Sequence, residues 1–132
     1  WRPGEHSGTF RGNQLAFVGA VAALEYVEEI DIVSKVKERE VFLKGYLHDQ
    51  IGSLSDKILI RGLGMIWGID VSNLGNHELS KKIALLCFDR GLIIERCGRE
   101  DTVLKVLPSL NIQLDVLEQG CNILKAAIND SM

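Results

Sequence analysis

A glycine-rich loop at residues 3–12 holds the side chains with the clearest potential for chemistry. It combines three glycines with the hydroxyls of Ser7 and Thr9 and the cation of Arg11, and it runs directly into an apolar segment. Unpaired backbone N–H groups and the positive end of a helix dipole favour an anion at such a position, and phosphate is the first candidate. The loop matches neither a Walker sequence nor a GxGxxG turn, so its residues alone indicate only a general anion site.

Other residue types that often carry catalysis form no complete set here. His6, His48 and His77 lie far apart, and none has a second ligand-type residue at metal spacing, so we expect no metal site. We interpret Glu5 beside His6 as a source of hydrogen bonds that fix the loop rather than as an acid–base pair. No pattern typical of a nucleophile elbow is present.

Composition limits the class of protein. The 132 residues are 46% hydrophobic and 25% charged, which is ordinary for one globular domain with its own core. A net charge of −3 disfavours nucleic acid and anionic membranes as partners. The longest apolar run, at 16–24, is too short to span a membrane. Three scattered cysteines predict reduced thiols and a cytoplasmic location.

Two helices are expected to follow the loop. The first, at 13–29, has Asn13 as its N-cap and is apolar all round. Such a helix is normally buried, so we expect it to pack against a partner domain or subunit that this chain lacks. The second follows Asp31, and its charged run at 35–40 is predicted to face water. Its apolar stripe consists of Ile32, Val36, Leu43, Leu47 and Ile51.

The remaining segments alternate between strands and helices. Residues 57–71 predict a hairpin that turns at a glycine pair, 77–89 a helix that ends at Gly91, and 92–94 and 102–107 two strands. The final helix spaces four residues as one buried stripe, which makes Cys121 a core thiol rather than a nucleophile. The stripe consists of Leu117, Cys121, Leu124 and Ile128. This order predicts an α+β sandwich, with helices packed on an antiparallel or mixed sheet.

Four motifs in order along the chain resemble the class III pyridoxal-phosphate aminotransferases. The loop and helix start at 4–16 resemble that family's H-x-S-T-F/Y-G-G-N-P-L-A, and the hairpin at 60–70 resembles V-R-G-x-G-L-M-W-G-I-E. The segments 91–94 and 103–110 resemble G-L-L-I and R-x-x-P-P-L. The resemblance implies a small C-terminal α+β domain of a fold-type-I enzyme. It divides the chain into the end of the large domain at 1–12, a linking and interface helix at 13–30, and the small domain at 31–132.

The resemblance also implies site residues. Thr9 and Gly8 would bind the phosphate of pyridoxal 5'-phosphate, a cofactor shared with the partner subunit of a homodimer or higher homo-oligomer. Lys105 stands where the family has an arginine that binds a substrate carboxylate, and a lysine offers a point charge instead of a fork. Arg99 or Arg96 could assist it. The lysine that forms the covalent bond to the cofactor would lie upstream of residue 1. We therefore expect no catalytic residue in this chain, and no activity from it alone.

Within the family, the loop and the run at 94–108 look most like enzymes that move an amino group between 2,4-diaminobutyrate and 2-oxoglutarate. Amino acids and 2-oxo acids are then the substrates. Ornithine, acetylornithine or 4-aminobutyrate are alternative substrates. Outside the family, a free-standing metabolite-binding module remains open, as does a dimerisation domain with 13–29 as its interface.

Overall fold

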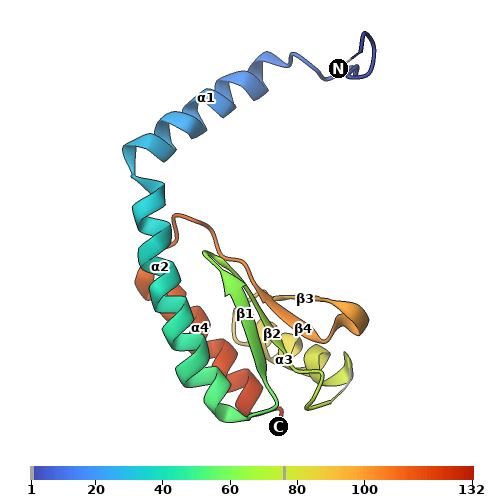
Figure 1. Cartoon of the computed structure of the whole chain (residues 1–132), viewed down its shortest axis with the longest axis vertical. Coiled ribbons are helices and arrows are strands. Elements are labelled where there is room, and N and C mark those ends of the chain that lie inside the picture. The colour runs from blue at the N-terminus through green and yellow to red at the C-terminus, as the bar shows by residue number, and fades with distance from the viewer. Residues whose placement is uncertain (1, 76) are drawn as a thin grey trace. The chain divides into compact units, whose positions relative to one another are not determined.

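The computed structural model describes residues 2–75 and 77–132. The described residues form two compact units, one that extends to residue 32 and one that begins at residue 33. Figure 1 shows the order of the elements along the chain. The helices are α1 (Gln14–Glu29), α2 (Ile32–Tyr46), α3 (His77–Asp89) and α4 (Leu114–Asn129). The strands are β1 (Leu59–Leu63), β2 (Ile66–Asp70), β3 (Glu95–Cys97) and β4 (Val103–Val106). After α2, a π-helical turn (Leu47–Ile51) and a 3-10 turn (Gly52–Leu54) lead towards β1.

The first unit consists of the glycine-rich loop and α1. The predicted N-cap is confirmed, because the Asn13 side-chain oxygen accepts a hydrogen bond from the Ala16 N–H at 3.1 Å. No residue of α1 is buried within this chain. The burial of α1 against another domain or subunit stays a prediction. Among the described residues, no helix is long and apolar enough to cross a membrane.

The second unit contains a four-stranded antiparallel sheet in the order β1-β2-β4-β3. The predicted hairpin is confirmed: β1 and β2 turn at Gly64, whose φ of 58° lies in the left-handed region that glycine adopts readily. A Cβ at Gly62 would lie 2.4 Å from the Ile66 carbonyl oxygen, so glycine permits this close packing of the two strands. The predicted α+β fold is therefore confirmed, with a sheet that is antiparallel throughout.

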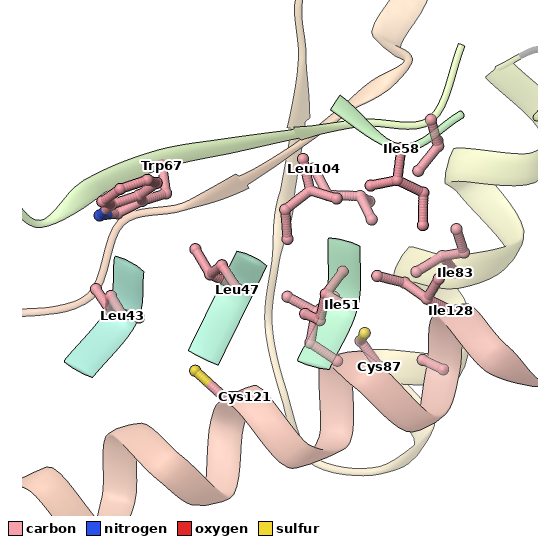
Figure 2. Close-up of a cluster of buried hydrophobic side chains, with 14 of the residues drawn as sticks. Leu43, Leu47, Ile51, Ile58, Trp67, Ile83, Cys87, Leu104, Cys121 and Ile128 are labelled. Atoms are coloured by element: carbon pink, nitrogen blue, oxygen red, sulfur yellow. The ribbon is translucent and has the colours of Figure 1, made fainter. Parts of the chain in front are cut away.

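The core lies between the sheet and helices α2, α3 and α4. Figure 2 shows side chains from α2, α4 and the strands pointing into the same interior. The predicted stripe of α4 is confirmed, because all four of its residues are buried. Burial raises the pKa of the Cys87 and Cys121 thiols to about 11 each, so both stay protonated at neutral pH. Cys121 is a core thiol, as predicted.

Two predictions of detail are wrong. The strand predicted at 92–94 instead forms at Glu95–Cys97, because these are the residues that pair with β4. The charged run at 35–40 does not all face water. Arg39 is only 5% exposed, and its Nε donates to the Ile112 carbonyl at 2.7 Å. The Glu40 carboxylate accepts a hydrogen bond from the Gly64 N–H at 2.8 Å, which ties the hairpin turn to α2.

Candidate functional site

The glycine-rich loop is exposed and contains two tight turns. Gly4 and Gly12 have φ values of 85° and 76°, which only glycine adopts without strain. The Arg11 N–H donates to the Gly8 carbonyl at 3.1 Å and closes a turn around Thr9. A Cβ at Gly8 would lie 3.2 Å from the Arg11 Nε, so the arginine side chain lies directly beside the glycine. The turn thus holds a guanidinium close to Gly8.

Free hydrogen-bond donors gather in the same turn. Within the described residues, the amides of Gly8 and Thr9 and the Thr9 hydroxyl make no internal hydrogen bond, and both residues are exposed. Two backbone N–H groups, a hydroxyl and a nearby arginine are a donor set that suits an anion with several oxygens. The residues present therefore fit the phosphate group of the cofactor implied by the resemblance.

A second group of polar residues lies on the face of the sheet opposite the core. Successive residues of a strand point to opposite faces, so the burial of Ile69 and Leu104 places their neighbours Gly68 and Lys105 on the open face. Four residues from four strands follow one another across this face: Arg61, Gly68, Lys105 and Glu95. Arg61, Gly68 and Lys105 line a shallow hollow of about 590 Å³.

Lys105 is the predicted carboxylate-binding residue, and it lies near the middle of this row. Its side chain is 31% exposed, and its Nζ forms an ion pair with Glu95 on the neighbouring edge strand. The hydrogen bond and charge of Glu95 raise the pKa of Lys105 above its ordinary value, so the amine stays protonated at neutral pH. Any carboxylate that binds Lys105 must therefore compete with Glu95.

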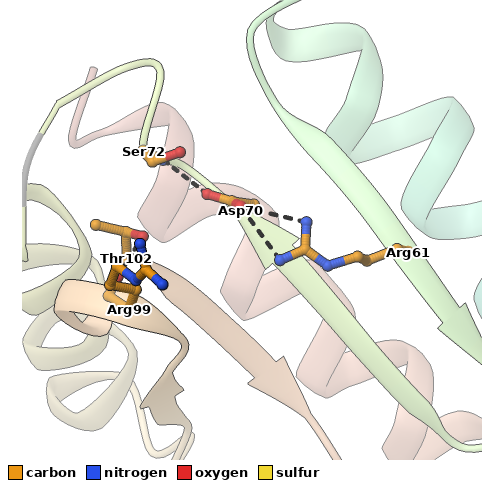
Figure 3. A network of polar contacts seen from close by, with 5 residues as sticks. All are labelled: Arg61, Asp70, Ser72, Arg99 and Thr102. Carbon is orange, nitrogen blue, oxygen red and sulfur yellow. Dashed lines mark hydrogen bonds and ion pairs between the residues drawn. The ribbon is translucent and has the colours of Figure 1, made fainter.

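A hydrogen-bonded network anchors Arg61 next to this hollow (Figure 3). Both Nη atoms of Arg61 donate to one oxygen of Asp70 at 3.2 Å, and the other oxygen accepts from the Ser72 N–H at 3.0 Å. Burial works to raise the pKa of Asp70, but the hydrogen bonds from Ser72 and Arg61 outweigh it and hold the pKa below its ordinary value. Asp70 is thus a fixed carboxylate that orients the guanidinium.

The two arginines predicted to assist Lys105 lie elsewhere. Arg99 begins a 3-10 turn (Arg99–Asp101) and lines a separate hollow of about 320 Å³ beside Asp70. Arg96 is paired with the buried Leu104, so it shares the core-facing register, and it donates to the His77 carbonyl at 3.4 Å. Arg61 lines both hollows, and sequence reasoning did not select it. The signal was available, because the alternation of the hairpin puts Arg61 and Gly68 on one face.

Strained backbone flanks the second hollow. Glu100 and Asp101 have φ values of 61° and 53°, an unusual conformation for residues with side chains. The buried Ser80 hydroxyl lies 2.6 Å from the Asp101 carbonyl oxygen and donates to it, which holds this turn against α3. Among the described residues, no group of three or more His, Cys, Asp or Glu side chains is placed to hold a metal ion.

Comparison with known proteins identifies the family. The family model described as Aminotransferase class-III matches residues 1–128. The chain belongs to this family. The match includes both the glycine-rich loop and the sheet that carries Lys105, so the two candidate sites lie in one class-III aminotransferase segment.

Two curated relatives with the same name illustrate the similarity. The diaminobutyrate–2-oxoglutarate transaminase of Wolinella succinogenes is 41% identical over 131 residues, which is 98% of this chain and 30% of that protein. The enzyme of the same name from Bordetella parapertussis is 39% identical over 134 residues, covering 100% of this chain and 30% of that protein. The chain therefore spans about 30% of the length of these relatives.

Solved structures agree on the fold. An aminotransferase from Bacillus anthracis superposes with a TM-score of 0.85 over 96% of this chain and 30% of its own length, at 24% identity. The glycine-rich loop, α1 and the α+β unit therefore belong to a fold that occurs within longer aminotransferases.

Proposed function

We propose that this chain is the C-terminal part of an aminotransferase that moves an amino group between L-2,4-diaminobutyrate and 2-oxoglutarate. The products are aspartate 4-semialdehyde and glutamate. The observation that carries this proposal is the identity of 41% and 39%, over almost the whole chain, to two enzymes named for that reaction. Ornithine, acetylornithine and 4-aminobutyrate are the competing substrates within the family.

The loop would hold the cofactor. Pyridoxal 5'-phosphate, when bound, supplies the carbonyl carbon that receives the amino group and the ring that withdraws electrons. In this chain, the hydroxyl and amide of Thr9 and the amide of Gly8 would donate to the phosphate, while Arg11 adds positive charge nearby. Hydrogen bonds to a charged group contribute roughly 1.5–3 kcal/mol each. These residues would bind and orient the cofactor. The residue that bonds to the cofactor covalently would lie outside this chain.

Lys105 would bind the substrate carboxylate. Its raised pKa keeps the amine charged, and its position on the open face leaves it accessible once Glu95 moves aside. A lysine attracts the carboxylate as a point charge, so other groups must fix the orientation of the substrate. The binding step thus exchanges an internal carboxylate for that of the substrate.

The working enzyme would be a cytoplasmic homo-oligomer. The side chains of α1 that lie exposed in this chain include Phe17, Val18, Val21 and Leu24. Apolar surface of this kind is usually covered by another domain or subunit. In a dimer, the loop of one subunit would complete the cofactor site of the other.

The first test measures amino transfer. The full-length polypeptide that carries this chain should convert 2,4-diaminobutyrate and 2-oxoglutarate to glutamate in the presence of pyridoxal phosphate, while the 132-residue chain alone should not. Faster turnover of ornithine or 4-aminobutyrate would reassign the substrate within the family. Turnover by the chain alone would refute the proposal that this chain binds the cofactor phosphate and substrate but needs the rest of the enzyme for the covalent steps.

The second test addresses Thr9. In the full-length enzyme, Thr9→Ala should weaken cofactor binding roughly tenfold, the loss of about one charge-assisted hydrogen bond. Cofactor retention is measured by equilibrium dialysis and by absorbance. Ser53→Ala, which removes an exposed hydroxyl outside the loop, is the matched control and should bind the cofactor as the wild type does. Unchanged affinity in Thr9→Ala would remove this residue from the phosphate site.

A further inference from the structure

We propose that Arg61 is a second carboxylate-binding residue, which together with Lys105 binds the two carboxylates of a five-carbon dicarboxylate. Lys105 binds one carboxylate of 2-oxoglutarate or glutamate, and Arg61 binds the other. This inference rests on the proposed aminotransferase function and adds to it a structural reason for selecting dicarboxylates. It proposes that residues on the open face of the sheet make the enzyme prefer a dicarboxylate as its oxo-acid substrate.

The register of the sheet supports this pairing. Arg61 on β1 and Lys105 on β4 both pair with Gly68 on β2, so all three point to the same face. Neighbouring strands are about 4.8 Å apart, which places the two backbones roughly 10 Å from each other. Both side chains are long enough to extend over the intervening glycine. The two cations can therefore reach a molecule whose carboxylates are separated by three carbon atoms.

Gly68 keeps the space between the cations open. A Cβ at this position would lie 3.1 Å from the Val103 Cγ1 and 4.0 Å from the Arg61 Cγ. Any larger side chain would point out of the sheet into the hollow that Arg61 and Lys105 share. Because Gly68 has no side chain, the carbon chain of a small diacid can lie against the backbone between the two cations.

Asp70 orients Arg61 and leaves several of its N–H donors available. Its side chain is 62% exposed, whereas the Asp70 carboxylate that anchors it is only 15% exposed. A guanidinium has five N–H donors, and the two bonds to a single Asp70 oxygen occupy one edge of it. At 3.2 Å these bonds are longer than the roughly 2.7–2.9 Å typical of charge-assisted pairs. The remaining donors can form the forked contact with a second carboxylate that a lysine cannot provide.

Lys105 complements Arg61, because its internal partner is easily displaced. Glu95 lies on the edge strand, its side chain is 68% exposed, and exposed ion pairs are individually weak. A dicarboxylate that displaces Glu95 from Lys105 gains a second ion pair at Arg61, whereas a monocarboxylate gains only one. The site therefore favours diacids over monoacids of the same length.

The direct test uses the 132-residue chain and a simple diacid. Titration with glutarate, followed by ¹⁵N NMR, should shift the amide signals of Gly68 and Lys105, and butyrate should shift them far less. Arg61→Gln should weaken glutarate binding roughly tenfold, which corresponds to about 1.4 kcal/mol. Arg90→Gln is the matched control, since Arg90 also pairs with an aspartate, Asp130, but does not line this hollow.

Full-length enzyme kinetics separate this inference from the proposed function. Arg61→Gln should raise the KM for 2-oxoglutarate roughly tenfold, change the KM for 2,4-diaminobutyrate much less, and leave kcat within about twofold. Arg61→Lys should give an intermediate KM. A wild type without transaminase activity refutes the proposed function, and the NMR titration of the chain still tests the diacid site. Equal glutarate binding by wild type and Arg61→Gln, or equal shifts with butyrate, overturns the inference.

Discussion

Helices α1 and α4 are both sixteen residues long, but they differ in how far they are buried within the chain. Most residues of α1 are apolar, yet none is buried, whereas α4 mixes charged and apolar residues and buries five of its residues. The apolar residues of α4 recur on one face, which packs against α2, α3 and the sheet. Those of α1 surround the helix. The comparison teaches that burial inside one chain follows the spacing of apolar residues and not their number.

The same substitution in the two helices should give the largest difference. Leu124 is 2% exposed and Leu24 is 66% exposed. In the 132-residue chain, Leu124→Ala should lower the free energy of unfolding by about 3 kcal/mol through lost burial and the cavity left behind. Leu24→Ala should change it by less than ~0.5 kcal/mol. Urea titration followed by tryptophan fluorescence measures both. Equal losses would break the comparison, because they would require Leu24 to be packed within this chain.

A second pair sharpens the comparison inside one helix. Arg39 is buried and donates to the Ile112 and Lys35 carbonyls, while Lys37 is exposed. Arg39→Met should cost about 2 kcal/mol of unfolding free energy, because the Ile112 carbonyl loses its donor. Lys37→Met should be nearly neutral. The same urea titration applies, and a neutral Arg39→Met would show that this hydrogen bond does not secure the loop before α4.

Alkaline pH gives a smaller test of burial in the second unit. The pKa of Cys87 and Cys121 is raised from 9.0 to about 11, so the folded state holds these protons more tightly than the unfolded chain. Stability should therefore fall as pH rises from 9 towards 11, by on the order of 1 kcal/mol per thiol. Comparison of urea midpoints at pH 8 and pH 10.5 measures the change. Cys121→Ala should show a shallower decline, and an identical decline would place the effect on other groups.

The smallest expected effect concerns the cap of α1. Asn13→Ala removes the acceptor for the Ala16 N–H and should cost the helix about 1 kcal/mol. Since α1 has no buried residue, the loss should appear as fraying of its first turn, with the unfolding midpoint of the second unit unchanged. Backbone chemical shifts of residues 14–18 report the fraying. Asn13→Asp should keep the first turn helical, because an aspartate oxygen can accept the same hydrogen bond. A shifted unfolding midpoint in Asn13→Ala would show that the start of α1 contributes to the stability of the second unit.

Most of the fold could be predicted because it depends on residues that are close together in the sequence. The glycine turn between β1 and β2, the stripe of α4, and the glycine that ends α3 each depend on residues within a few positions of one another. The strand at 95–97 was predicted three residues too early. Its limits depend on which residues face Val103–Lys105 across the sheet, and a single strand does not contain that information.

The polar residues were harder to predict, for a related reason. Arg39 and Glu40 lie in a charged run that resembles a solvated helix face, and their partners, Ile112 and Gly64, come from distant segments. Arg61 gains its role from its neighbours across the sheet, which only strand pairing reveals. Thr9, Gly8, Lys105 and Arg99 were selected by resemblance, and their roles in binding remain predictions.

The strand order also has a consequence for the order of folding. Strand β2 pairs with β1 immediately along the chain, but its other edge pairs with β4, which is more than thirty residues later in the sequence. During synthesis on the ribosome, the hairpin can form while that second edge is still unpaired. An open edge of this kind attracts other strands, and ribosomes add only about 5–20 residues per second. The nascent chain therefore passes through an interval of seconds in which this edge of β2 is open to pairing with strands of other chains.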